Sequence, residues 1–266
     1  MLYMWQGICH DGCPDTYAHY RIPFAKSLEP NNILVLPEIC AIPTVDPMTM
    51  NILWNIPMKK KYMWWLAPYM AGTHDLRGRF PIHLSQSVYT QEELRTGTGI
   101  ESTILGDYID PIFFSPYDPK KKQNKILCGP KTPQAWMDEL RRKLPADVEL
   151  MRLKGLDWPT LVRRMGEAKV YLSMDVKAGS DRLSREGVLQ GCCIVADKQG
   201  GWNDIDLGIP TQYKIPMGDV DAAVKLAMDC INHYDERIRD FDSYLDYTNH
   251  NESVFEQQVR KIFKKE

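Results

Sequence analysis

The feature that most constrains the fold is a regular alternation of two patterns in the C-terminal half of the chain. Short segments rich in apolar residues are separated by longer segments whose apolar residues share one helix face, as Trp136 and Leu140 do. The short segments, which we expect to be strands, are residues 124–128, 148–151, 169–173 and 192–196. Strands that alternate with helices at this spacing form a parallel sheet covered by helices. The sequence therefore predicts an α/β fold for this half.

Local signals place the starts of several helices. Thr132 is followed by Pro133, which predicts a capped helix start after the first strand. Asp219 is expected to cap a later helix, and Ser253 with Glu256 forms a capping box. This box introduces an apolar stripe at helical spacing, which consists of Phe255, Val259, Ile262 and Phe263. The chain is therefore expected to end in helices.

The N-terminal half has a less regular pattern that also fits an α/β fold. Strands are expected at residues 2–5, 33–36, 62–65, 82–84 and 101–105, with a helix at 89–95. A proline-rich segment, residues 111–119, then leads into Lys120, Lys121 and Lys122. Prolines followed by a charge run are typical of a linker, so we place a domain boundary near residue 119. A surface loop inside a single domain is the alternative.

Composition limits the classes of protein to which the chain can belong. Apolar residues make up 44% of its 266 residues, which is typical of a globular protein and excludes disorder as the main state. The 33 Lys and Arg residues nearly balance the 35 Asp and Glu residues, so the chain is not a general polyanion binder. A local basic patch remains compatible with this balance.

Cysteine usage and hydropathy give an expected location. No apolar run approaches the ~18 residues that span a bilayer, and residues 1–5 lack the basic start and apolar core of a signal peptide. The seven cysteines are scattered and odd in number, and a chain of this length builds a core without disulfides. We therefore expect reduced thiols, no membrane span and a cytoplasmic location.

The segment after the third strand of the C-terminal half carries the most informative polar residues. Gly179 allows a close approach of the backbone, and Ser180 supplies a hydroxyl at the start of the predicted helix. Arg182 and Leu183 follow, and Arg182 can pair with phosphate oxygens. Glu186 lies four residues after Arg182, and its carboxylate can accept hydrogen bonds from two ribose hydroxyls. The alternative is a solvated helix start with an Arg–Glu ion pair.

Two further loops follow strands of the same predicted sheet. Gly129 and Lys131 come after the first strand, where Lys131 can meet a diphosphate or be an ordinary solvated lysine. Lys154 and Gly155 come after the second strand, where the backbone can face a nucleobase or form only a turn. Because the carboxyl ends of parallel strands share one edge, the three loops converge and together predict a ligand site.

These segments resemble the donor-binding domain of GT-B glycosyltransferases, in particular family-4-type and exostosin-like members. In that family a glutamate in a short helix is followed by a glycine, a buried strand and a Gly-Gly loop. The matching segments are residues 167–173, 182–187, 191–196 and 200–201, while residues 83–94 and 104–114 resemble the strand, helix and crossing before the second domain. The resemblance implies two Rossmann-like domains with a cleft between them, an acceptor-binding domain at 1–118 and a nucleotide-sugar-binding domain with terminal helices at 119–266.

The resemblance also implies roles for individual residues. Glu186 would bind the ribose of a nucleotide-sugar. The resemblance also implies that this donor is a UDP-sugar. Ser180, Arg182 and Lys131 would meet the diphosphate, and Gly155 would lie near the base. No metal ion is required in this scheme, because cations and a helix N-terminus stabilise the leaving diphosphate.

One position departs from the family pattern. Family-4-type enzymes usually have a second glutamate eight residues before the ribose-binding one, and here Ala178 holds that position. The arrangement is therefore closer to the exostosin-like pattern, and the sugar and the stereochemical outcome stay open. The chain is also short for the family, and minimal versions are common in viruses and phages, which suggests a viral origin and a host-cytoplasmic location.

The acceptor side and a general base are expected in the N-terminal half. His10 and Asp11 follow the first predicted strand and Glu38 follows the second, and each can accept a proton from an attacking hydroxyl. A structural role is the alternative for each of them. Cys9 and Cys13 flank His10, but no second ligand pair stands at a spacing suited to zinc, and we assign no metal.

Three functions fit the sequence. The first is a glycosyltransferase with a glycan acceptor. The second is a glycosyltransferase acting on a hydroxylated DNA base, for which the near-neutral charge is unfavourable and the cluster of Lys120, Lys121, Lys122 and Lys125 is favourable. The third is an inactive nucleotide-binding protein of the same fold, which the alanine at position 178 favours.

Overall fold

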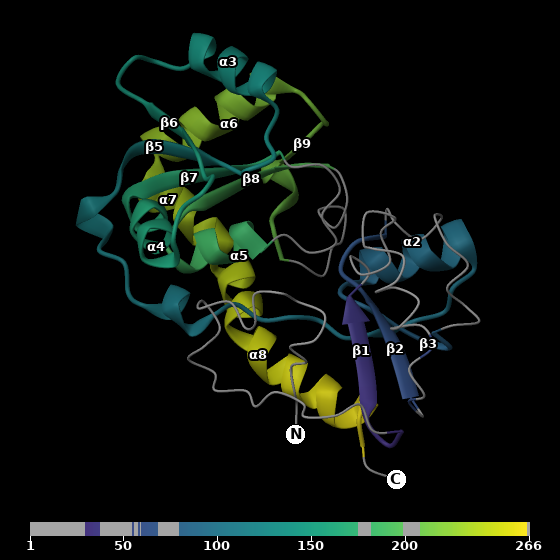
Figure 1. Cartoon of the computed structure of the whole chain (residues 1–266). Helices are drawn as coiled ribbons and strands as arrows, with labels where there is room; N and C mark the ends of the chain where they lie inside the picture. The colour runs from purple at the N-terminus through teal and green to yellow at the C-terminus, as the bar shows by residue number, and fades with distance from the viewer. Residues whose placement is uncertain are drawn as a thin grey trace.

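The computed structural model describes residues 30–37, 55, 58, 60–68, 80–174, 182–198 and 208–264. These residues form an α/β structure with two parallel sheets (Figure 1). The smaller sheet has the order β1-β2-β3-β4 and the larger sheet has the order β6-β5-β7-β8-β9. Every pair of neighbouring strands is parallel. The predicted α/β class is therefore confirmed for these residues.

The strands lie close to their predicted positions. Those of the smaller sheet are β1 (Ile33–Pro37), β2 (Lys60–Trp65), β3 (Ile82–Ser85) and β4 (Thr103–Ile104). Those of the larger sheet are β5 (Gln123–Cys128), β6 (Glu149–Arg152), β7 (Ala168–Ser173), β8 (Cys193–Asp197) and β9 (Lys214–Ile215). The two-residue β9 was not predicted, because two residues carry no periodic pattern. The strand predicted at residues 2–5 lies outside the described residues.

Helices cover both faces of the larger sheet. The helices are α2 (Val88–Thr98), α3 (Gln134–Lys143), α4 (Trp158–Glu167), α5 (Arg182–Leu189), α6 (Val220–Asn232), α7 (Tyr234–Arg237) and α8 (Asp242–Ile262). The helices α4 and α5 pack on one face of this sheet, whereas α3 and α6 pack together on the other (Figure 1). This layering explains why the strands between them are apolar on both sides.

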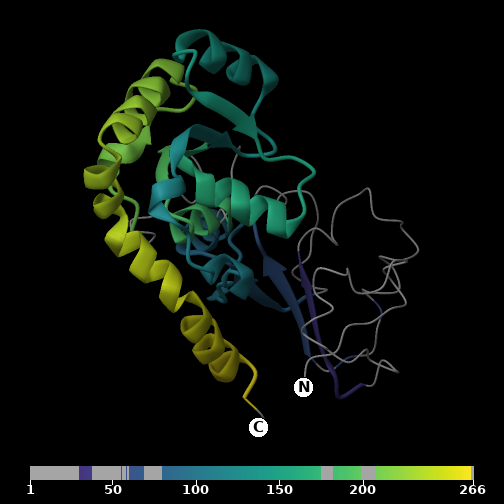
Figure 2. The same cartoon turned by 90° about the vertical axis from the view of Figure 1, so that its left-hand side faces the viewer.

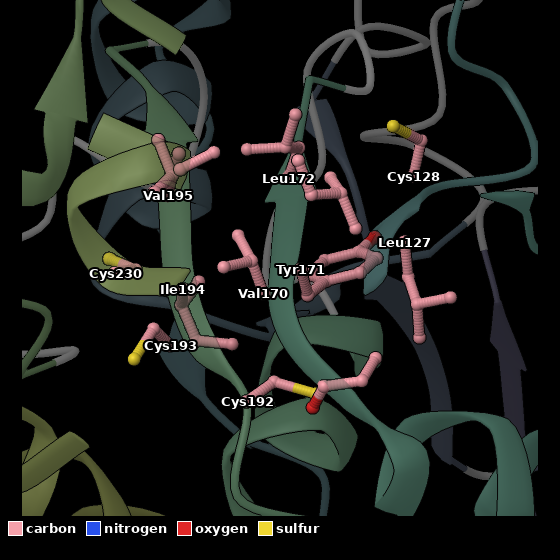
Figure 3. Packing of buried hydrophobic residues seen from close by; sticks show 14 of the residues in the cluster. Leu127, Cys128, Val170, Tyr171, Leu172, Cys192, Cys193, Ile194, Val195 and Cys230 are labelled. Carbon is pink, nitrogen blue, oxygen red and sulfur yellow. The ribbon is translucent and has the colours of Figure 1, made fainter. Parts of the chain in front are cut away.

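The core of the larger sheet is made by strands that are buried along their whole length. Val170, Leu172 and Val195 of β7 and β8 are fully buried, and Cys230 of α6 packs against them from one face (Figure 3). Cys128, Cys192, Cys193 and Cys230 are buried free thiols. On the opposite face, Gly187 of α5 lets the helix approach the sheet closely, since an added Cβ would lie 3.3 Å from Ile194 Cδ1.

The last helix joins the two sheets. The helix α8 begins beside the larger sheet and runs alongside the smaller one (Figures 1 and 2). The predicted apolar stripe of this helix is confirmed, because Phe255, Val259 and Ile262 pack against the core of the smaller sheet. The rings of Tyr62 and Phe263 meet edge to face with centroids 5.0 Å apart. The C-terminal residues therefore complete the core of the N-terminal half.

Two predicted helix starts are wrong. The capping box at Ser253 lies inside α8, where the Ser253 hydroxyl donates to the carbonyl of His250 instead of capping. The helix α3 begins at Gln134 with Pro133 at its N-cap position, and among the described residues no side chain caps it, so Thr132 is not a cap. The cap at Asp219 is confirmed, since its carboxylate accepts from the backbone N–H of Ala222.

The proline-rich segment is held by hydrogen bonds near its middle. We call residues 105–122 the crossing segment, because they lead from β4 to β5; they include the short 3-10 helices η4 (Pro111–Phe114) and η5 (Pro119–Lys121). The amide of Gln190 donates to the carbonyls of Phe113 and Ser115 at 2.7 and 2.9 Å. The strands of the smaller sheet all precede residue 119 in the sequence, and those of the larger sheet all follow it. The division into two domains at that residue stays a prediction.

Candidate functional site

The order of strands in the larger sheet indicates where a ligand binds. From β5 the chain passes through α3 to β6 on one side, and then through α4 to β7 on the other side of β5. The connections therefore change direction between β5 and β7. In open α/β sheets, ligands bind at this topological switch point. The predicted loops after β5 and β6 leave this edge, and residues 175–181 of the third predicted loop lie outside the described residues.

A backbone hydrogen bond joins the chain at the ends of β5 and β6. The backbone N–H of Leu153 donates to the carbonyl of Cys128 at 2.9 Å, and Cys128 is the register partner of Arg152. Gly129 follows directly and is buried, whereas the Lys131 side chain is exposed at the loop tip. This exposure fits both a contact to a diphosphate and an ordinary solvated lysine, so the role of Lys131 stays a prediction.

The loop after β6 presents an open backbone. Gly155 has a positive φ of 69°, and no atom lies within 4 Å of the position that a Cβ would take. Lys154 and Gly155 are both exposed. The turn predicted at this position is present, and its backbone is accessible at the same edge as Lys131.

The start of α5 brings together two of the predicted residues. A guanidinium nitrogen of Arg182 (Nη2) lies 3.3 Å from Glu186 Oε1, and their side chains are 39% and 5% exposed. The alternative of a solvated ion pair therefore fits Arg182 but not Glu186, which is buried. Leu183 is half-buried and packs against the core. Gly179 and Ser180, which precede the helix, lie outside the described residues, as does Ala178.

The candidate bases of the acceptor side all come from the N-terminal half. His10, Asp11 and Glu38, the candidate bases, lie outside the described residues. Their roles stay predictions. Among the described ranges, no group of three or more His, Cys, Asp or Glu side chains is arranged to hold a metal ion. Within the same ranges, no helix combines the length and apolar character needed to cross a bilayer.

The lysine cluster at the end of the crossing segment, Lys120, Lys121, Lys122 and Lys125, is only partly accessible. The ammonium of Lys122 donates to the carbonyls of Met165, Ala168 and Gln190 at 3.1, 2.5 and 2.6 Å. Burial lowers the pKa of Lys122. Lys125 is buried and pairs with Glu167 at 3.0 Å. Lys122 and Lys125 therefore bind groups within the protein, and of the four lysines that favoured DNA binding only Lys120 and Lys121 are exposed.

Three residues at or near the site were not singled out from the sequence. Arg152 ends β6 and donates to the side-chain oxygen of Gln134 at 3.0 Å. Asp197 ends β8 and is fully buried, and Arg185 of α5 is 1% exposed. A strand-end position marks Arg152 and Asp197 once the strand limits are known. No local pattern marks Arg185, because charged residues on short helices are usually solvated.

Comparison with known proteins identifies the fold. No family model and no curated protein matches the sequence. The structure of HepE from Anabaena in complex with UDP-glucose aligns with a TM-score of 0.65 at 12% identity, over 81% of this chain and 75% of that one. TarM from S. aureus, in complex with UDP, α-GlcNAc-glycerol and fondaparinux, aligns with a TM-score of 0.65 at 12% identity, over 88% and 55%.

A third structure extends the same similarity. The UDP-forming α,α-trehalose-phosphate synthase of Burkholderia xenovorans aligns with a TM-score of 0.59 at 9% identity, over 89% of this chain and 75% of that one. Identities this low show a shared fold and not a shared activity. The chain therefore has the α/β fold of GT-B glycosyltransferases, as its resemblance to them implied. The exostosin-like subtype and the viral origin stay predictions.

Proposed function

We propose that this protein transfers a sugar from a nucleoside-diphosphate sugar to a hydroxyl of a glycan acceptor, with UDP as the nucleotide. The observation that supports the proposal is the strand order of the GT-B-like sheet, because the segments that carry Lys131, Lys154 and Arg182 each follow one of the three strands at its switch point. In the proposal these three side chains supply cations, and Glu186, which lies 3.3 Å from Arg182, supplies a carboxylate. UDP or a UDP-sugar is bound in two of the aligned structures, which supports the choice of nucleotide.

The proposed reaction exchanges one bond at the anomeric carbon for another. The bond from this carbon to the diphosphate oxygen breaks, and its electron pair stays on the diphosphate. The acceptor oxygen forms the new bond to the anomeric carbon and loses its proton to a base. Charge accumulates on the leaving oxygens in a transition state that resembles an oxocarbenium ion, so fixed cations beside the diphosphate lower the barrier. Arg182 and Lys131 take this role in our proposal.

The ion pair at the start of α5 is compatible with both proposed roles. Arg182 has five N–H donors and a side chain that is 39% exposed, so it can contact a phosphate while it remains paired with Glu186. The carboxyl oxygens of Glu186 can accept hydrogen bonds from ribose hydroxyls. For the acceptor proton we propose His10, Asp11 or Glu38 as the base.

The acceptor choice rests on charge. Binding to duplex DNA depends on clustered, accessible Lys and Arg side chains. Because Lys122 and Lys125 are engaged within the fold, the cluster that favoured a DNA acceptor is halved. A glycan acceptor requires no such patch, and we prefer it. We propose that the reaction needs no metal ion, because in this scheme cationic side chains and the start of α5 stabilise the diphosphate.

A thermal-shift screen of nucleotide-sugars followed by a turnover assay tests the proposal. A ligand at a hundred times its dissociation constant stabilises the folded chain by about 2.7 kcal/mol, so a bound donor is readily detected. We expect stabilisation by UDP and a UDP-sugar, with slow release of UDP from that sugar. Stabilisation without any turnover would favour the inactive nucleotide-binding protein, and a shift on adding duplex DNA would favour the DNA acceptor.

The chain offers a matched control for the proposed phosphate contact. Arg260 and Glu256 form another Arg–Glu pair four residues apart, on the exposed surface of α8, with an N–O distance of 3.4 Å. We expect Arg182→Ala to reduce turnover by about a hundredfold, as loss of one transition-state donor typically does, and Arg260→Ala to leave it unchanged. Equal activity of the two variants would remove Arg182 from the donor site.

A further inference from the structure

A fully buried guanidinium joins three elements beside the candidate donor site. Arg185 of α5 is 1% exposed. Its Nη2 donates to Asp107 Oδ1 at 2.7 Å, and its Nη1 donates to Asn251 Oδ1 at 3.1 Å. Asp107 belongs to the crossing segment and Asn251 to α8, which passes beside α5 (Figure 1). One side chain therefore fixes α5 to both segments that lead to the smaller sheet.

Stability alone is a poor reason for such an arrangement. Bringing a guanidinium and a carboxylate out of water costs about as much as their attraction returns, and an apolar group of similar size often stabilises equally well. The rigid fork of an arginine instead fixes direction, because its N–H groups must point at two acceptors at once. The contribution of Arg185 is therefore geometric: it sets the position of α5 relative to the crossing segment and α8.

The same two segments are anchored on the smaller sheet. The side-chain oxygen of Gln258 in α8 accepts from the backbone N–H of Gly106 at 2.8 Å, one residue before Asp107. The rings of Phe255 and Tyr108 lie with centroids 5.2 Å apart. The crossing segment and α8 are thus bound to each other where they reach the smaller sheet. A displacement of either one reaches α5 through Arg185.

The position of α5 matters because its first turns carry the candidate donor residues. Arg185 directly precedes Glu186 and lies three residues after Arg182. We propose that Arg185 is a positioning residue for donor binding, which holds Arg182 and Glu186 in the correct place relative to the crossing segment and α8. The inference rests on the proposed function. It adds that nucleotide affinity depends on a contact that does not itself touch the nucleotide.

Two variants weaken the contact without removing the charge at Asp107. Arg185→Lys keeps the positive charge but loses the fork, since one ammonium cannot reproduce two directed guanidinium bonds. Asn251→Ala removes the second acceptor, together with the bond from Nδ2 to the carbonyl of Tyr247 within α8, and leaves the pair of Arg185 with Asp107 in place. It is the milder change, which keeps the test usable if the first variant does not fold. Arg237→Lys is the matched control, because Arg237 forms an Arg–Asp pair with Asp229 at 2.5 Å between α7 and α6.

Amide hydrogen exchange and UDP calorimetry are measured on the same folded samples. We expect the amides of residues 182–189 to exchange about tenfold faster in Arg185→Lys, and by a smaller factor in Asn251→Ala, because α5 loses an anchor. We expect the dissociation constant for UDP to rise about tenfold in Arg185→Lys and to change by less than about twofold in Arg237→Lys.

The outcomes separate this inference from the proposed function. Unchanged exchange in α5 in both variants would overturn the inference, as would faster exchange with an unchanged affinity for UDP, which is the result of a purely structural contact. If the unaltered chain does not bind UDP, the proposed function fails together with the donor-binding role of Arg185. The exchange data would then still decide whether Arg185 positions α5.

Discussion

Replacing Gly191 by alanine tests how tightly the crossing segment is docked on the larger sheet. Gly191 has a φ of 73°, and a Cβ built there would overlap the ring of Tyr117 and lie 2.7 Å from its hydroxyl oxygen. The Tyr117 ring in turn lies 4.8 Å from the ammonium of Lys122. An alanine at this position therefore strains the backbone and also displaces a side chain of the crossing segment.

The two costs can be separated with other glycines of the same chain. Gly155 has a φ of 69° but open space where a Cβ would stand, so Gly155→Ala measures the backbone cost alone, about 1–2 kcal/mol. Gly191→Ala adds the cost of overpacking, about 1–3 kcal/mol more. Gly97 lies in α2 with nothing within 4 Å, so Gly97→Ala is expected to stabilise by roughly 0.5–1 kcal/mol.

Urea unfolding of the three variants gives the comparison. We expect the midpoint to fall most for Gly191→Ala, less for Gly155→Ala, and to rise for Gly97→Ala, with the same dependence on denaturant in each case. If Gly191→Ala is no more destabilising than Gly155→Ala, Tyr117 gives way without cost. The crossing segment would then not be docked as the structure shows it.

Three further predictions concern the fold and the reaction. Lys122→Met leaves three carbonyls without their common donor and is expected to lower the free energy of unfolding by about 3 kcal/mol, which urea unfolding measures; an unchanged midpoint would mean that water replaces the ammonium. Hydrogen bonding from Arg237 lowers the pKa of Asp229 below its ordinary 3.8, so its stabilising contribution is present above that pH and is lost as the pH falls through the lowered value. Asp229→Asn should therefore reduce the loss of stability in acid, and an identical acid profile would argue against this pair. Turnover of a UDP-sugar should be unaffected by a chelator such as EDTA, and loss of activity that added metal restores would contradict the metal-free scheme.

Much of the fold follows from local patterns in the sequence. The strands of the larger sheet other than β9 are predictable because each is a short segment with apolar residues, bounded by glycine, proline or polar residues, as β8 is. Asp219 is correctly predicted as a cap because a short acceptor before an apolar helical pattern has a local effect. These features depend on near neighbours, which the sequence shows directly.

The failures come from contacts between distant segments. Ser253 has the neighbours of a capping residue, but it lies in the interior of α8. The helix continues past Ser253 because α8 packs on both halves of the chain. Lys122 is in a charge run that is typical of a solvated linker, yet carbonyls up to 68 residues away surround its ammonium. Neither outcome can be derived from local spacing, because the partners are brought together only by the completed fold.

The candidate site also has features that are predictable from the sequence and features that are not. That the segments after β5, β6 and β7 begin at one edge is predictable, since the carboxyl ends of parallel strands share an edge whatever the details of packing. The burial of Glu186 beside a half-exposed Arg182 is not predictable from their spacing of four residues, which fits a solvated pair equally well. Arg185 is the clearest case, because its partners Asp107 and Asn251 lie 78 and 66 residues away.

The most direct test of the central claim is a calorimetric titration of the chain with UDP, repeated on Glu186→Gln and on Glu256→Gln, the corresponding change in the exposed pair of α8. The account predicts one bound UDP per chain, an affinity at least about tenfold weaker in Glu186→Gln, and no change in Glu256→Gln. Absence of UDP binding to the unaltered chain, or equal affinity in all three proteins, would contradict the assignment of the start of α5 to a nucleotide-sugar.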